Sequence, residues 1–145
     1  MELNILRADP AGNITVFVLD PVEKVQRAAI AEKIMAIPAL KAEQVGYACA
    51  AEDDVDGHME MMGGEFCGNA TRAYGMYIAQ QKGGLSSVRL RVSGCDHVVT
   101  AQVDLKSGTA RAEMPCPRSV KRVTVNGHEA VSYTHLRAHE TLRHL

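Results

Sequence analysis

One short stretch of the sequence combines a cysteine with the backbone features that make a thiol reactive. The stretch Gly64–Thr71 (GEFCGNAT) places Cys67 where a glycine-rich loop gives way to a predicted helix over residues 68–82. The first turn of a helix leaves backbone N–H groups unpaired, and these groups and the helix dipole attract anions and favour thiolate over thiol. A thiolate beside a cradle for a carboxylate is equipped for proton transfer at the carbon next to that carboxylate.

The elements before Cys67 are predicted from apolar patterning and helix signals. A strand covered on both faces is expected over residues 13–20, followed by a helix with Asp20 as N-cap and Pro21 at its first position. This helix should end near Ala36, before Pro38. Strands are expected over residues 44–50 and 57–62. The residues expected to face inward from the first helix are Val22, Val25, Ala29, Ile30 and Ile34.

The helix after Cys67 carries few strongly polar residues, which is typical of a buried helix. Gly83 and Gly84 should end it. Strands are then expected over residues 87–92, 98–105, 109–114 and 120–125. This order predicts an α+β fold, with a mixed or antiparallel sheet wrapped around a buried central helix.

Composition excludes several classes of function. The 145 residues suit one core, and a net charge of −1 gives no electrostatic case for binding nucleic acid or an anionic membrane. No apolar run approaches the ~20 residues that span a bilayer. The N-terminus lacks the layout of a signal peptide. We therefore expect a cytoplasmic protein.

The four cysteines, at positions 49, 67, 95 and 116, form no C-x-x-C pair and have no histidine at ligand spacing. A zinc site needs such local pairs, so no metal site is predicted. Disulfides are not expected in a reducing compartment. We expect Cys49, Cys95 and Cys116 to be core or strand residues.

The end of the chain breaks the preceding pattern. Residues 131–141 (VSYTHLRAHET) match the in-frame translation of a transposase-type sequencing-library adapter. We therefore expect residues 131–145 to be a non-native tail, and residues 1–130 to be the N-terminal domain of a longer, two-domain protein.

Four separate motifs resemble the diaminopimelate epimerase superfamily of cofactor-independent racemases, and are most similar to histidine racemases of staphylopine-type metallophore biosynthesis. The resemblance covers residues 3–125. Its motifs are Pro10-x-Gly12-Asn13-x-Thr15, Glu43-Gln44-Val45-Gly46, Gly64-x-Phe66-Cys67-Gly68-Asn69-Ala70-Thr71 and Val92-Ser93-Gly94-Cys95. It implies two similar halves around a substrate cleft, each with one cysteine at the start of its central helix, and neither pyridoxal phosphate nor a metal.

The same resemblance implies roles for five residues. Cys67 would be the acid/base of the first half, Gly68 and Asn69 would hold the substrate carboxylate through backbone N–H groups, Asn13 would contact the substrate, and Glu43 matches an acidic position of the site. The implied partners are a small amino-acid substrate and the missing C-terminal half of the protein. A homodimer is a further candidate assembly.

Departures from the superfamily pattern bear on the substrate. The chain has Glu60–Gly64 (EMMGG) where diaminopimelate epimerases carry an Asn-Ala-Asp-Gly-Ser-like stretch, and Ala70-Thr71 where they carry Gly-Ala. Both favour histidine as substrate. Alternatives are a diaminopimelate epimerase, a proline racemase or hydroxyproline epimerase, or a non-catalytic half that only binds an amino acid. No second C-G-S-G-like loop is present, so this chain alone is expected to be inactive.

Each of these residues also has a structural explanation. Cys67 could be a small buried apolar residue. Asn13 follows Gly12 and suits a turn, and Glu43 follows the surface-like Lys41-Ala42 and suits a solvated position. Asn69 could simply cap a helix.

Overall fold

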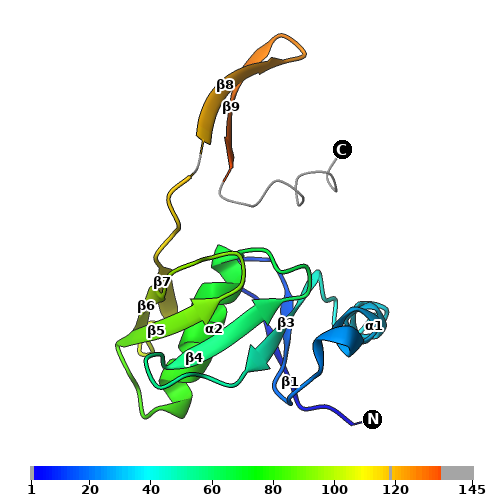
Figure 1. Ribbon diagram of the computed structural model, residues 1–145, viewed down its shortest axis with the longest axis vertical. Helices are drawn as coiled ribbons and strands as arrows, with labels where there is room; N and C mark the ends of the chain where they lie inside the picture. Colours follow the sequence, from blue (N-terminus) through cyan, green and yellow to red (C-terminus); the bar gives the residue numbers. More distant parts are fainter. Residues whose placement is uncertain (1, 118, 135–145) are drawn as a thin grey trace. The chain divides into compact units, whose positions relative to one another are not determined.

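The structure, a computed structural model, describes residues 2–117 and 119–134. The chain divides into two compact units, Met1–Glu113 and Met114–Leu145. Figure 1 shows the fold, coloured along the sequence from blue at the N-terminus to red at the C-terminus, and the elements follow in chain order. They are β1 (Ile5–Ala8), β2 (Thr15–Val18), α1 (Lys24–Met35), β3 (Gln44–Cys49), β4 (Gly57–Met61), α2 (Gly68–Gln81), β5 (Ser87–Val92), β6 (Val99–Asp104), β7 (Thr109–Ala112), β8 (Ser119–Val125) and β9 (His128–Thr134).

The first unit is a seven-stranded mixed sheet in the order β1-β2-β3-β4-β5-β6-β7. Two of its strand pairs are parallel, β2 with β3 and β4 with β5, and the other pairs are antiparallel. A helix connects the strands of each parallel pair, α1 in the first and α2 in the second. The sheet curls around α2 (Figure 1), so the predicted α+β class is confirmed.

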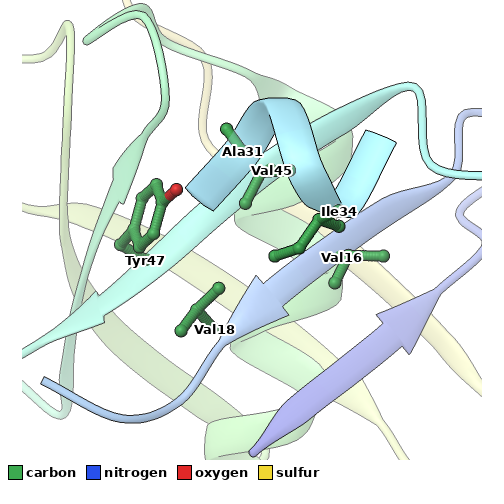
Figure 2. Packing of buried hydrophobic residues seen from close by; sticks show 6 residues of the cluster. All are labelled: Val16, Val18, Ala31, Ile34, Val45 and Tyr47. Carbon is green, nitrogen blue, oxygen red and sulfur yellow. The ribbon is translucent and has the colours of Figure 1, made fainter. Parts of the chain in front are cut away.

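Helix α1 packs on the outer face of β2 and β3. Because successive side chains of a strand point to opposite faces, Val16 and Val18 lie on one face of β2. Figure 2 shows this apolar cluster, in which Ala31 and Ile34 of α1 lie over the sheet. Its buried members are Val16, Val18, Ala31, Ile34, Val45 and Tyr47.

Helix α2 packs on the opposite face of the same sheet. Phe17 is fully buried, and its ring centroid lies 5.5 Å from that of Tyr74 in α2. Gly75 brings the helix close to β6, because a Cβ at this position would lie 2.8 Å from the Cβ of Ala101. Burial raises the pKa of Tyr74 to about 12, so its hydroxyl stays protonated and donates a hydrogen bond to His58 O at 3.2 Å. These contacts fix the helix whose first turn begins after Cys67.

A polar network next to the apolar cluster joins α1 to β3 and β4. Arg27 forms an ion pair with Glu60, and the two side chains are 14% and 22% exposed. Lys24 Nζ lies 3.2 Å from Glu60 Oε1, and His58 Nε2 lies 3.8 Å from it. Tyr47 donates its hydroxyl hydrogen bond to Arg27 O at 2.6 Å. Burial raises the pKa of Glu60, but the hydrogen bonds and charges of Arg27 and Lys24 outweigh it, so the pKa lies below its ordinary value.

Glu60→Gln is expected to destabilise the protein in a pH-dependent way. Because the pKa is lowered on folding, the ionised carboxylate stabilises the protein at pH values above 4.5, the pKa that the group has in the unfolded chain. This stability is lost as the pH falls through the lower pKa of the folded protein. At neutral pH we expect the free energy of unfolding to fall by about 1–3 kcal/mol, because Arg27 keeps its partly buried charge without its partner. Urea unfolding at neutral and acidic pH measures this difference.

The matched control is Glu32→Gln in α1, the helix that carries Arg27, because Glu32 is exposed and its substitution should change little. A Glu60→Gln effect of equal size well below pH 4.5 would show that the charge of Glu60 is not what stabilises the network.

The sequence predictions for the first helix are partly wrong. Val25 is 89% exposed and Ala29 is also exposed, whereas Arg27 and Ala31 face the sheet. The inward stripe therefore runs 27, 30, 31 and 34, and a charged residue in it hid the pattern. Asp20 is not the N-cap. The cap position is Glu23, which makes no side-chain cap hydrogen bond, and Asp20 instead accepts hydrogen bonds from Asn4.

The second unit contains a hairpin of β8 and β9 in antiparallel register. Asn126 and Gly127 form its turn with φ of 50° and 80°, as expected for an Asn-Gly hairpin. The tail predicted from the adapter match overlaps β9 at Val131–Thr134, and the remainder of it lies outside the described residues. Strand pairing does not test the origin of a sequence, so the non-native tail stays a prediction. No helix in the described part of the chain has the length and hydrophobicity to cross a membrane.

Candidate functional site

Cys67 is the N-cap residue of α2, as the sequence predicts. Its backbone is extended, and its Sγ accepts a hydrogen bond from Ala70 N–H at 3.5 Å. Its carbonyl accepts hydrogen bonds from the N–H and the hydroxyl of Thr71, at 2.9 and 2.8 Å. Among the described residues, no acceptor takes the backbone N–H of Gly68 or Asn69. The thiol therefore lies beside two helix amides that can receive an anion.

Gln44 links Cys67 to the first sheet strands. Its side-chain nitrogen Nε2 lies 3.3 Å from Cys67 Sγ, 2.7 Å from Asn13 Oδ1 and 2.7 Å from Thr15 Oγ1. A side-chain amide carries two hydrogens, so at any moment Gln44 donates to two of these three acceptors. Sulfur is the most distant of the three. Gln44 therefore holds a donor near the thiol while its position is set by Asn13 and Thr15.

The parallel register of β2 and β3 brings these polar residues to one end of the sheet. Thr15 and Gln44 are direct partners in that register, and Thr15 is fully buried. Asn13 precedes β2, and its N–H donates to Pro10 O at 3.4 Å, which closes the turn. Ala11 and Gly12 both have positive φ in this turn, 59° and 87°. The Pro-x-Gly-Asn motif thus shapes the loop that presents Asn13 to Gln44.

Glu43 lies at the same end of the sheet, but its hydrogen bonds are with the backbone of Ile14 and not with the groups around Cys67. Its N–H donates to Ile14 O at 3.0 Å, and its carboxylate accepts a long hydrogen bond from Ile14 N at 3.5 Å. Its side chain is exposed, and the structure gives it no hydrogen bond to Cys67 or Gln44. The five predicted site residues therefore divide into a group around the thiol (Asn13, Cys67, Gly68 and Asn69) and Glu43 at its margin.

Gln44 and Thr15 are the site residues that sequence reasoning did not select. Both lie inside the quoted motifs, and each begins a strand. A polar side chain at the first position of a buried strand is the signal that would have singled them out. Their meeting depends on the parallel pairing of two strands that are separated by a helix.

The other three cysteines lie in different settings. Cys49 is in β3 next to Arg27, whose Nη2 lies 3.4 Å from its Sγ, and burial raises the pKa of this thiol even though Arg27 opposes the shift. Cys95 follows β5 and Cys116 follows β7, so the prediction that they are core or strand residues is wrong for both. Neither position belongs to the regular part of the sheet.

Two clusters in the described part of the chain have metal-ligand chemistry, and neither includes Cys67. The first is Cys49, His58 and Glu60, and the second is Cys95, Asp96 and His97. Glu60 already pairs with Arg27 and Lys24, which disfavours an added cation. The second cluster consists of three consecutive residues at a turn, with Asp96 and His97 exposed.

A cavity of about 430 Å³ opens elsewhere, between β1, α2 and the turn before β7. Arg72, Met76 and Tyr77 of α2 line it, and none of the five predicted site residues does. The candidate site is instead a cluster of mostly half-buried groups at the beginning of α2, in which Thr15 is fully buried. It offers a thiol, an amide donor and two helix amides.

Comparisons with known proteins agree with the four motifs. A family model described as "Histidine racemase CntK N-terminal domain" matches residues 2–145. A histidine racemase of Staphylococcus aureus is 32% identical over 122 residues, which make up 81% of this chain and 44% of that relative. A histidine racemase of Fusobacterium nucleatum is 42% identical over 79 residues, 53% of this chain and 27% of the relative.

The chain spans less than half the length of these curated relatives. The resemblance inferred from the motifs is confirmed, including its restriction to an N-terminal half. The chain therefore belongs to the histidine racemase family, whose N-terminal domain it matches along nearly its whole length.

Proposed function

We propose that this chain is the N-terminal half of a cofactor-independent amino-acid racemase that inverts the Cα of histidine for metallophore synthesis in the cytoplasm. The observation that carries the proposal is the position of Cys67 Sγ, at the N-cap of α2 and 3.3 Å from Gln44 Nε2. The histidine racemase relatives support the substrate.

The proposed reaction requires three functions from the residues of this half. As a thiolate, Cys67 takes the proton from Cα, and the electron pair of the broken C–H bond is delocalised toward the substrate carboxylate. The N–H groups of Gly68 and Asn69 bind that carboxylate and stabilise the charge as it develops. Asn13 and Glu43 contact the remainder of the amino acid.

The proton that completes the inversion comes from the opposite side of the substrate cleft, which the C-terminal half provides. A thiol of the missing C-terminal half gives a proton to the opposite face of Cα, so that one thiolate and one thiol exchange roles in each turnover. No electrons leave the substrate, and the reaction needs no oxidant. The missing half is thus the obligatory partner of this chain, and a homodimer of the complete protein is a further expectation.

Exchange in D2O tests the function. The complete protein, extended to the length of its relatives, and the present chain are each incubated with L-histidine. Proton NMR follows deuterium at Cα, and chiral chromatography follows D-histidine. We expect exchange and racemisation with the complete protein only, because two-base catalysis requires both walls.

Other outcomes of these assays would change the proposal in different ways. Turnover of proline, hydroxyproline or diaminopimelate without turnover of histidine would replace the substrate. Binding of amino acids without any exchange would make the protein a binding module. Rapid exchange by the present chain would refute its predicted inactivity.

A further inference from the structure

The loop before Cys67 is tied to the end of a strand that comes much later in the chain. Ser93 directly follows β5, and its hydroxyl donates a hydrogen bond to Glu65 O at 2.7 Å. The same hydroxyl accepts a hydrogen bond from Met61 N at 2.8 Å. One hydroxyl thus joins the last residue of β4 to the carbonyl two positions before Cys67.

Gly94 adds a steric constraint at the same place. It has a φ of 71°, and a Cβ at this position would lie 2.2 Å from Phe66 N and 2.7 Å from Glu65 C. Real Cβ atoms do not approach backbone this closely, so the position requires glycine. Phe66 itself is buried, with 9% exposure. The peptide between Glu65 and Phe66 therefore lies directly against the backbone of Gly94, and the side chain that follows it is buried.

These contacts determine where the thiol lies. The Cys67 backbone follows directly from the held peptide, while the remainder of α2 is fixed independently by its packing, with Thr71 fully buried and Tyr74 at 3% exposure. Sγ receives two N–H donors at ordinary distances for sulfur, 3.5 Å from Ala70 N and 3.3 Å from Gln44 Nε2. A displacement of the loop would therefore shift Sγ relative to both donors, while the hydrogen bonds from Thr71 to the Cys67 carbonyl keep the start of α2 in place.

We propose that Ser93 is a positioning residue for Cys67, acting through the Glu65 carbonyl with Gly94 as its steric support. The inference rests on the proposed function, because it assigns Ser93 to the orientation of the reacting thiol. Ser93 itself touches no substrate. Its effect should appear in the chemical step and in the reactivity of Cys67, while the helix amides that bind the carboxylate stay in place.

Ser93→Ala tests this, with Ser87→Ala as the matched control, since Ser87 lies exposed at the other end of β5. The first measurement is the rate of Cys67 alkylation by iodoacetamide in the present chain, followed by site-resolved mass spectrometry. We expect Ser93→Ala to slow it about tenfold, because the thiolate loses its donors. In the complete protein we expect kcat to fall on the order of 10- to 100-fold with a much smaller change in KM.

Ser93→Thr keeps the hydroxyl and should restore both the alkylation rate and kcat, while Ser87→Ala should alter neither. If Ser93→Ala does not fold, the milder Ser93→Cys serves in its place and should show the same two effects at smaller size.

The proposal would be overturned if Ser93→Ala lowered the urea midpoint but left the alkylation rate and kcat at their wild-type values. Ser93 would then be a purely structural residue. Failure of the function is distinguishable. If the complete wild-type protein racemises no amino acid, the proposed function fails, and the alkylation rates still decide whether Ser93 positions the thiol.

Discussion

Cys67→Ser in the complete protein is expected to reduce histidine racemisation by roughly 10²–10⁴-fold, the range contributed by a positioned acid or base. A hydroxyl is far less acidic than a thiol, so the serine cannot supply an anionic base at neutral pH. Serine is also one of the best N-cap residues. The first turn of α2, where Ala70 N–H donates to the side chain of residue 67, should therefore stay intact.

This substitution separates catalysis from folding. Urea unfolding should give the same or a slightly higher midpoint than wild type, because the hydroxyl caps the helix more strongly than sulfur. Cys116→Ser is the matched control, since Cys116 is exposed, and it should leave racemisation unchanged. Substantial racemisation by Cys67→Ser would show that another group removes the Cα proton, and would refute the proposed mechanism.

The part of the fold that local signals determine could be predicted from the sequence. Helix α2 begins at Gly68 as expected, and Gly83, with a φ of 78°, ends it where predicted. Strand β5 has the predicted bounds, because its apolar alternation is uninterrupted. The position of Cys67 at a helix N-cap follows from these same signals.

Features that depend on distant parts of the chain could not be predicted in this way. Strand β1 (Ile5–Ala8) has a weak pattern of its own, and it forms through antiparallel pairing with β2. The inward face of α1 includes Arg27, because Glu60 from β4 compensates its charge. Likewise, Gln44 reaches Cys67 only because β2 and β3 pair in parallel. The residues proposed to perform the chemistry were visible locally, whereas the groups that position them are set by tertiary structure.

Phe17→Ala is expected to lower the free energy of unfolding by about 3–5 kcal/mol, a large part of the ~5–15 kcal/mol that stabilises a typical domain. Phe17 has no exposed surface and packs its ring against Tyr74. The loss therefore combines the transfer energy of a buried ring with a cavity between β2 and α2. The matched control is Val25→Ala, because Val25 is 89% exposed and should have little effect. Urea unfolding measures both.

Gly46 offers a sharper test of the same contact, because a Cβ there would lie 2.8 Å from Phe17 Cδ1. Alone, Gly46→Ala should destabilise by about 1–3 kcal/mol through overpacking. Combined with Phe17→Ala, its methyl group enters the space that the ring has left, so the double variant should be more stable than the sum of the single effects predicts. Strict additivity, or a Phe17→Ala loss below about 1 kcal/mol, would mean that the core relaxes around the cavity and that Phe17 does not anchor α2. In that case the position of Cys67 would depend on the loop contacts of Ser93 and Gly94 more than on the packing of the helix.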